Sequence, residues 1–403
     1  MSETCEERRI SHYEERLEAI ERQSRERLRR CRQRPWWDPR RLACVIRHII
    51  RTFVEWITTL IEVWEEYREC ERMGYDYCLE GVTSGDEYET IYNDHSEYFL
   101  RKGIRDQTKC PEHCLAVKFL GTNSLYITDG RSHILIDPFF SRPDVNPLAM
   151  RFTEVWPLSH VISQTLEHAH IERVDAIVLT HAHYDHAMDI AEVAKTIESR
   201  QNHPPKILGC RSIAHIARGG GISPHHIQVI GENVTIPGPG EFTLTFLPAA
   251  HIFIPEPGLN GEISSDLFPP VPAIDYKLGQ IHAIHIGHPF CSLLNLGSAA
   301  SKNNTLQNIH ADFLLMGIGG FDTLMPPTKR SVYDETVGFV NPRQILFTHW
   351  DNFRKRLDQP PEFFRPVSLI SDPRISVNYF RSRGNQPVHF MRIWDCVFLK
   401  RDG

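Results

Sequence analysis

Histidine and aspartate side chains gather at one point of the chain, directly after a short apolar stretch. Residues 174–180 read Val-Asp-Ala-Ile-Val-Leu-Thr, which is typical of a buried strand. His181, His183, Asp185 and His186 follow at once. Where a strand ends and the chain turns, successive side chains need not alternate across a sheet, so several of them can surround one point. Imidazole and carboxylate groups suit zinc and neighbouring first-row metals, and the cluster therefore predicts a metal site.

This cluster resembles a known family signature. Residues 181–186 read His-Ala-His-Tyr-Asp-His, which resembles the H-x-H-x-D-H motif of the metallo-β-lactamase superfamily. The resemblance covers roughly residues 115–360, and residues 117–143 look like the first hairpin of that fold. It implies an α+β fold, namely an αββα sandwich of two sheets covered by helices.

Two further motifs carry the same resemblance downstream. The sequence Pro-Ala-Ala before His251 looks like the third ligand motif of the family, and residues 342–353 look like the last one, with His349. The H-W-D-x-F ending of that last motif most resembles the subgroup of ascorbate-6-phosphate lactonase and the phospholipase D that cleaves N-acyl-phosphatidylethanolamine.

By this resemblance the candidate ligands divide into two sets. One metal would be held by His181, His183 and His251, and the other by Asp185, His186 and His349. Three histidines with an open position are the pattern of a catalytic zinc, which lowers the pKa of bound water to about 7. We expect one or two divalent metals per chain, with zinc favoured and manganese or iron as alternatives. Asp137 would accept a hydrogen bond from a ligand histidine and fix its tautomer.

The chain departs from the family at the bridging aspartate. The resemblance places that residue before Ala299, where this chain reads Leu-Gly-Ser and ends in Ser298. A neutral hydroxyl neutralises charge between two cations less well than a carboxylate. Three outcomes stay open: two metals bridged by hydroxide alone, one metal with Asp185 as general base, or loss of hydrolysis. The alignment could also be shifted, and the next aspartate along the chain is Asp312, in the following strand. His285 and His288 are interpreted as edge or surface histidines, or alternatively as residues that compensate for the missing carboxylate or contact an anionic substrate.

The expected activity is hydrolysis of an ester-type bond, with a phosphodiester or a lactone favoured, by metal-activated hydroxide. Asp185 and His349 are the candidate catalytic residues, and His349 with the second metal would stabilise the developing oxyanion. The substrate would be a small or lipid-like molecule. The alternative is a non-hydrolytic member of the fold, either an iron-dependent oxidoreductase or a metal-binding interaction protein, because Ser298 replaces the expected aspartate.

Composition excludes some classes of protein. The 403 residues carry a formal charge of −6, which argues against a general nucleic-acid binder. The first residues are acidic and lack the basic and apolar run of a signal peptide, which favours the cytoplasm. The ten cysteines have no regular spacing, and we expect them to be free. Cys110 and Cys114 could instead clip a structural zinc.

We divide the chain into an N-terminal helical hairpin over 1–74, a connector over 75–114 and a catalytic domain over 115–403. The second helix of the hairpin has one apolar stripe, and its charged faces exclude a transmembrane span. We expect the hairpin to pack on the catalytic domain or on a second copy of the chain. Membrane contact is the less favoured alternative. The connector should lie on the domain surface.

From Leu115 onward short strands alternate with helices. Strands are predicted at 115–120, 124–128, 132–136, 174–179, 206–209, 226–230, 242–247, 281–286, 292–296, 312–317 and 344–348, with one or two more within 388–399. Helices are predicted at 161–168, 188–197, 213–218 and 330–340.

Overall fold

The computed structural model describes residues 86–102, 113–252, 257–302, 304–365 and 371–401, together with the single positions Arg22, Gln23, Glu26, Cys44 and Arg51. The chain divides into two compact units, 1–77 and 78–403. The predicted helical hairpin falls outside the described residues except for those single positions, so it stays a prediction. Everything that follows concerns the second unit.

Two mixed sheets form the centre of this unit. The first has the order β17-β1-β2-β3-β5-β6-β7, and the second has the order β13-β9-β11-β12-β14-β15-β16, with β8 paired to β9. The strands of the first sheet are β1 (Leu115–Phe119), β2 (Leu125–Thr128), β3 (His133–Ile136), β5 (Ala176–Val178), β6 (Lys206–Gly209), β7 (Ile227–Val229) and β17 (Cys396–Leu399). Those of the second are β8 (Val234–Pro237), β9 (Thr243–Ala250), β11 (His282–Gly287), β12 (Leu293–Leu296), β13 (Ala300–Ser301), β14 (Phe313–Gly317), β15 (Gln344–Thr348) and β16 (Val388–Phe390).

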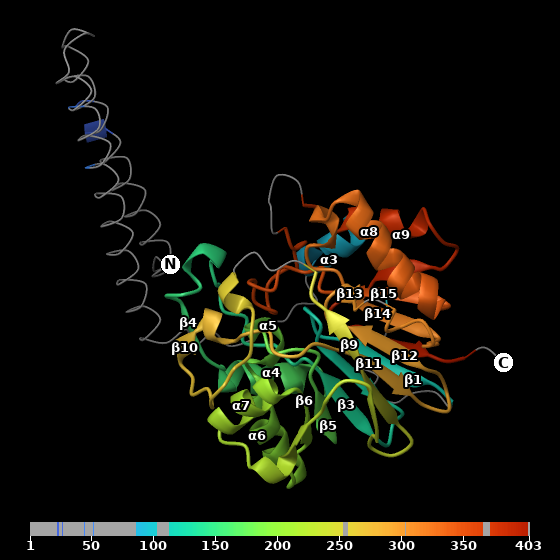
Figure 1. Ribbon diagram of the computed structural model, residues 1–403, viewed down its shortest axis with the longest axis horizontal. Helices are drawn as coiled ribbons and strands as arrows, with labels where there is room; N and C mark the ends of the chain where they lie inside the picture. Colours follow the sequence, from blue (N-terminus) through green and yellow to red (C-terminus); the bar gives the residue numbers. More distant parts are fainter. Residues whose placement is uncertain are drawn as a thin grey trace. The chain divides into compact units, whose positions relative to one another are not determined.

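Helices cover the outer faces of both sheets. Figure 1 shows α4, α6 and α7 beside β5 and β6, and α8 and α9 beside β14 and β15. The helices are α3 (Asp86–Asp94), α4 (Ser159–His168), α5 (Tyr184–Ala187), α6 (Ile190–Gln201), α7 (Arg211–Gly219), α8 (Pro326–Tyr333) and α9 (Arg374–Arg381). Short 3₁₀ turns occur at Pro147–Ala149, Pro224–His226, Pro257–Leu259, Ala273–Asp275 and Phe321–Thr323, and a π-helical turn, Asp334–Gly338, follows α8. The predicted αββα sandwich is confirmed.

The central strands read as continuous apolar runs because they are covered on both faces. In β1, β12 and β14 every residue is buried, and β14 reads Phe-Leu-Leu-Met-Gly. In the first sheet β3, β5, β6 and β7 run parallel, and in the second β12, β14, β15 and β16 do. The ends of β3, β5, β9 and β15 carry the predicted site residues. The backbone N–H of His282 at the start of β11 donates to the carbonyl of Thr180 (2.8 Å), which joins the two sheets there.

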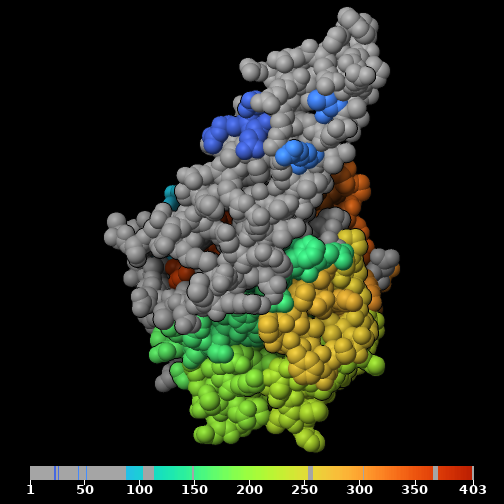
Figure 2. All heavy atoms as spheres, turned by 90° about the vertical axis from the view of Figure 1, so that its left-hand side faces the viewer, coloured from blue at the N-terminus to red at the C-terminus, as the bar shows by residue number. Residues whose placement is uncertain are grey.

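All strands predicted from the sequence occur, and a few elements were missed. The missed strands are β4 (Glu154–Val155), β8, β10 (Val271–Pro272) and β13. They are short, or their residues are partly exposed, so they give no clear apolar pattern. The strands β4 and β10 pair with each other, and Figure 2 shows the yellow-to-orange segment around β10 lying against the green segment around β4. Helix α8 begins at Pro326, earlier than predicted, because proline is accepted in the first turn of a helix.

Within the predicted surface connector, 75–114, the described residues 86–102 do not simply lie on the domain surface. They contain α3, in which Tyr88 and Tyr92 are buried, and Phe99 follows in the core. Tyr92 and Phe99 both make edge contacts with Trp350, at centroid distances of 6.3 and 4.9 Å. The four-residue spacing of the two tyrosines was the available signal, since residues i and i+4 share one face of a helix.

Two of the remaining expectations can be compared with the structure. Cys44 and Cys114 each take part in a disulfide, which corrects the prediction that the cysteines are free. The disulfide at Cys114 speaks against a zinc clip there, since a disulfide sulfur is no longer a thiolate and does not bind the metal. Cys210, Cys291 and Cys396 are free and buried. A search of the described helices finds none that is long and apolar enough to cross a membrane.

Asp189 holds the loop after β3 against the start of α6. Its carboxylate accepts hydrogen bonds from the backbone N–H groups of Phe140 (2.6 Å) and Ser141 (2.8 Å) and from the hydroxyl of Ser141 (2.7 Å). The side chain is fully buried, and burial raises the pKa of Asp189 to about 6. This one residue therefore fixes the path of the chain next to the candidate ligands.

We expect Asp189→Ala to lower the free energy of unfolding by about 3 kcal/mol or more, because each buried donor left unsatisfied costs about 1–3 kcal/mol. Asp189→Asn keeps an acceptor oxygen and should cost less. A carboxyl whose pKa is higher in the folded state than in the unfolded state loses stability as pH rises. Wild type should therefore gain stability relative to Asp189→Asn as pH falls from 7 to 4. Urea unfolding at both pH values measures this, and equal differences at both would contradict it.

Candidate metal centre

The candidate centre starts where β5 ends. His181 follows the strand, and His183 precedes the single helical turn α5, which carries Asp185 and His186. This turn directs the side chains to one region in place of the alternation of a strand. All four side chains are buried, with residue exposures between 0% and 8%. The predicted strand followed by a ligand cluster is what the structure shows here.

The structure brings all six predicted ligand residues together in two neighbouring sets. The donor atoms of His181, His183 and His251 lie within 4.8 Å of one another, and so do those of Asp185, His186 and His349. In the first set the ring centroids are 4.9–5.1 Å apart. The two sets are adjacent, because the ring centroids of His181 and His186 lie 4.0 Å apart. His251 follows β9 and His349 follows β15, so both sheets contribute.

The first set has the chemistry of a metal cage. The Nδ1 atom of His181 lies 3.1 Å from the hydroxyl of Thr180, and His183 forms a hydrogen bond with the backbone of Leu259. Within the part of the chain that the structure describes, the Nε2 atoms of both histidines have no hydrogen-bond partner. Burial lowers the pKa of His183 to about 4 and the pKa of His181 well below its usual value, so both rings are neutral at pH 7. Neutral, buried, unpartnered imidazole nitrogens fit a divalent metal.

The second set combines a carboxylate with two imidazoles. The Nε2 atom of His349 lies 3.2 Å from Asp185 Oδ2, and that of His186 lies 3.7 Å from the same oxygen. Burial alone would raise the pKa of Asp185, but the His186 charge and the hydrogen bond to His349 outweigh it and lower that pKa. Asp185 is therefore ionised at neutral pH, as a ligand must be. This donor set suits zinc, manganese or iron.

Asp137 lies behind His186, as the resemblance implied. Its Oδ2 atom is 2.8 Å from Nδ1 of His186, and its Oδ1 atom accepts the backbone N–H of Thr180 (2.7 Å). Because Asp137 takes Nδ1, the Nε2 atom of His186 is left to face the second set. Asp137 is fully buried and its backbone has a φ of 41°, a conformation held by these contacts.

The side chain of Ser298 forms a hydrogen bond with the backbone of a neighbouring segment. Its hydroxyl accepts a hydrogen bond from the backbone N–H of Ile252 (3.0 Å), the residue after His251. A side chain on the preceding Gly297 would place its Cβ 2.2 Å from the hydroxyl of Thr180, so glycine is required there. Ser298 thus holds the chain next to a ligand histidine, and among the described residues the carboxylates grouped with the six ligands are those of Asp137 and Asp185.

The candidate replacements for the bridging carboxylate lie elsewhere. Asp312 bonds Ser292 and Arg401 at the opposite end of β12 and β14. His285 contacts the carbonyl of His310, and His288 pairs with Asp129 at 3.3 Å beyond the far end of β11. The proposal that His285 or His288 compensates for the carboxylate is therefore wrong, and Asp312 does not supply it through a shifted alignment, because strand direction carries all three residues away from the site.

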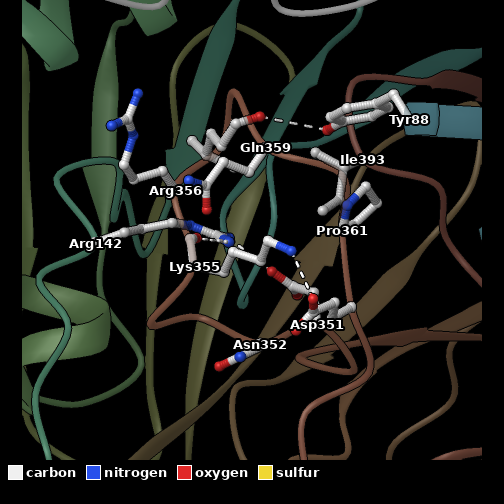
Figure 3. A pocket seen from close by; sticks show the side chains of 11 residues that line it. Tyr88, Arg142, Asp351, Asn352, Lys355, Arg356, Gln359, Pro361 and Ile393 are labelled. Atoms are coloured by element: carbon white, nitrogen blue, oxygen red, sulfur yellow. Dashed lines mark hydrogen bonds and ion pairs between the residues drawn. The ribbon is translucent and has the colours of Figure 1, made fainter. Parts of the chain in front are cut away.

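A buried ion pair braces His349, and it was missed in the sequence. The backbone N–H of His349 donates to the carbonyl of Thr122 (2.5 Å), and the N–H of Thr122 donates to Asp351 (2.8 Å). Asp351 in turn pairs with Arg142 at 2.7 Å, and both side chains are at most 2% exposed. Figure 3 shows Arg142 reaching toward Asp351 and Lys355 beside a small cavity. The aspartate of the H-W-D-x-F ending was the available signal.

An aromatic wall stands beside the second set. The Tyr184 and Phe353 rings are 6.3 Å apart, and the Phe353 and Phe364 rings 4.8 Å apart. Phe353 also makes an edge contact with His349, at 5.2 Å. On the other side of His349, a Cβ on Gly319 would lie 2.9 Å from its Nδ1 atom, so a larger residue would push the ring out of place.

Comparisons with known proteins agree with this picture. Residues 117–208 match the model of the family described as the Metallo-beta-lactamase superfamily. The chain is 27% identical over 251 residues to a protein of Thermococcus kodakarensis named a UPF0173 metal-dependent hydrolase, and the match covers 62% of this chain and 91% of that protein. These matches support the predicted superfamily and the prediction of a metallo-hydrolase.

Two solved structures resemble this chain at lower sequence identity. One is Igni18, a metallo hydrolase from Ignicoccus hospitalis, with a TM-score of 0.45 and 17% identity over 72% of this chain and 100% of that one. The other is YhfI, a metallo-beta-lactamase fold protein from Bacillus subtilis, with a TM-score of 0.45 and 15% identity over 71% of this chain and 100% of that one.

Asp137→Asn should weaken zinc binding by about 10- to 100-fold, the usual effect of removing a partner that orients a ligand histidine. An amide cannot accept from all the donors around Asp137. Competition with a chromogenic chelator measures the affinity. Asp312→Asn is the matched control, because it alters another buried, hydrogen-bonded carboxylate outside the site. Unchanged zinc affinity in Asp137→Asn would contradict the assigned role.

Proposed function

We propose that this chain is a metal-dependent hydrolase of ester-type bonds, with a phosphodiester favoured and a lactone as the second substrate class. The observation that carries the proposal is the pair of donor sets, joined where the rings of His181 and His186 lie 4.0 Å apart. A divalent metal bound there supplies Lewis acidity, which makes water acidic enough to act as a nucleophile at neutral pH. Zinc is the proposed metal, with manganese or iron as alternatives.

The protein residues divide the remaining work. His181, His183 and His251 are held neutral by burial, so they offer lone pairs at neutral pH. Asp185 is a weak base because its pKa is low, which favours a role as ligand over a role as general base. His349 lies next to it, and we assign His349, together with a metal held by the second set, to the stabilisation of the negative charge that develops on the substrate.

The absence of a bridging carboxylate is compatible with hydrolysis in this proposal. Among the described residues, no carboxylate beyond those of Asp137 and Asp185 is grouped with the ligands to take the place of the bridging aspartate expected at Ser298. All six proposed ligand residues are nevertheless in place. The relative position of the two sets is then fixed by the scaffold around Asp137 and Ser298. We therefore favour two metals without a carboxylate bridge over a single metal.

A cation beside the aromatic wall supports an anionic substrate. Arg354 follows Phe353, and within the described residues its guanidinium has no acidic partner and its Nε atom is buried without a hydrogen bond. Burial raises the pKa of Tyr184, and the charge of Arg354 opposes that rise, which places Arg354 within electrostatic reach of the residue before Asp185. An unpaired guanidinium next to an apolar wall suits a phosphodiester with an apolar group, including a lipid-like one.

The direct test is a hydrolysis panel with zinc- or manganese-loaded protein and a p-nitrophenyl phosphodiester, a lactone and a thioester. We expect turnover of the phosphodiester and its loss in His181→Ala. A protein that hydrolyses none of the three, and in which His181→Ala changes nothing, would refute the proposal. Colour and oxygen uptake after anaerobic iron loading would favour the iron-dependent oxidoreductase, the alternative suggested by Ser298.

Arg354→Met should raise KM for the phosphodiester by about 10- to 100-fold, since a hydrogen bond to a charged group contributes about 1.5–3 kcal/mol. The same variant should leave turnover of a neutral lactone within about threefold, because no charge is recognised there. Arg356→Met is the matched control, because that arginine pairs with Asp358 in the same loop. Equal effects on charged and neutral substrates would contradict the role of Arg354.

Partner and location proposals come from the sequence. We propose that the helices over 1–74 pack on the catalytic domain or on a second copy of the chain, and that no nucleic acid is bound. A pull-down lost on deleting residues 1–73, with an inactive remainder, would instead indicate an interaction protein. We keep the cytoplasm as the proposed location, although the disulfide-bonded Cys44 and Cys114 count against it, since disulfides persist in oxidising compartments.

A further inference from the structure

Asn123 lies in the turn between β1 and β2 and is completely buried. Its amide nitrogen donates to Asp137 Oδ2 (2.8 Å) and to Asn295 Oδ1 (3.1 Å). Its amide oxygen accepts from the hydroxyl of Thr348 (2.8 Å) and from Nδ2 of Asn295 (3.2 Å). Both hydrogens and both lone pairs of the amide are thus used, which is the full capacity of an asparagine side chain.

Two hydrogen-bond partners of Asn123 support different ligands of the second donor set. Asp137, at the end of β3 in the first sheet, bonds Nδ1 of His186. Thr348, at the end of β15 in the second sheet, is the residue before His349. The rings of His186 and His349 lie 5.3 Å apart. One side chain therefore connects the supports of two candidate ligands that come from different sheets.

The amide orientation follows from these partners. The Thr348 hydroxyl donates to the amide oxygen, so the nitrogen must face the Asp137 carboxylate, which takes further hydrogen bonds from Thr180 and His186. An aspartate at position 123 would set two carboxylates against each other, and an alanine would leave several buried groups unpaired. The site therefore requires the amide in this orientation.

We propose that Asn123 is a positioning residue that sets the distance between His186 and His349 and so acts mainly on metal binding at the second donor set. This inference rests on the metal centre of the proposed function. In a chain that has Ser298 where the family has a bridging carboxylate, the two ligand-bearing sheets must be held in register by the scaffold. Asn123 makes that connection directly beneath the second set. Among the described residues, Asn123 makes no hydrogen bond to the first set, His181, His183 and His251. Its partner Asp137 reaches that set one step further away, through the hydroxyl of Thr180, which lies 3.1 Å from Nδ1 of His181.

The experiment is a stepwise Co²⁺ titration of the metal-free full chain, followed by visible absorption and checked by metal analysis. For Asn123→Ala we expect the second Co²⁺ to bind about 10- to 100-fold more weakly and the first to stay within about threefold of wild type. Asn295→Ala is the matched control, because Asn295 is also completely buried and bonds Asn123, but within the described residues its side chain makes no hydrogen bond to Asp137 or Thr348. Both of its affinities should stay within about threefold of wild type.

Thr348→Val removes one of the two connections without changing the shape of the side chain. Thr348→Val should weaken Co²⁺ binding at the second donor set, but by less than Asn123→Ala. It replaces Asn123→Ala in the test if that variant does not fold. The proposal is overturned if wild type binds a single Co²⁺, if Asn123→Ala and Thr348→Val both leave the second affinity unchanged, or if either weakens both sites equally. The readout is binding, so an ordered two-metal titration in a protein without hydrolase activity would refute the proposed function while leaving this inference intact.

Discussion

The candidate centre depends on a buried carboxylate at the end of β3. Asp137 takes hydrogen bonds from the backbone and hydroxyl of Thr180, from Asn123 and from His186. A carboxylate in the interior is tolerated when such donors replace water around it. The ends of β3 and β5, the β1–β2 turn and α5 must therefore come together around this group, and the position of His186 follows from that requirement.

Local strain is concentrated where the chain delivers these groups. Asp137 and His349 both have positive φ values, 41° and 54°, which side-chain-bearing residues seldom adopt. Each is held by buried hydrogen bonds from elsewhere, His349 through Thr122 and the ion pair of Arg142 with Asp351. Strained backbone that the surroundings enforce is frequent at functional sites, because it aims a side chain in a direction that regular structure would not give.

The sequence was sufficient for the parts of the structure with a strong local signal. Continuous apolar runs gave the strands that are covered on both faces, and the H-x-H-x-D-H cluster marked the turn after β5. The roles of Asn123 and Arg142 could not be predicted, because their partners are far away in the sequence and a single asparagine or arginine has no periodicity. The wrong candidates, His285 and His288, were considered because they are near Ser298 along the chain, whereas strand direction carries them away from the site.

The order of the ligands along the chain has a consequence for how the protein matures. The cluster at 181–186 leaves the ribosome early, His251 follows, and His349 comes only with β15 in the second sheet. During synthesis the first histidines are thus exposed before their partners exist, and they can form no selective cage. The first donor set becomes complete once His251 has been made, but the second requires His349, so an ion of the second set would be selected only by a nearly complete polypeptide.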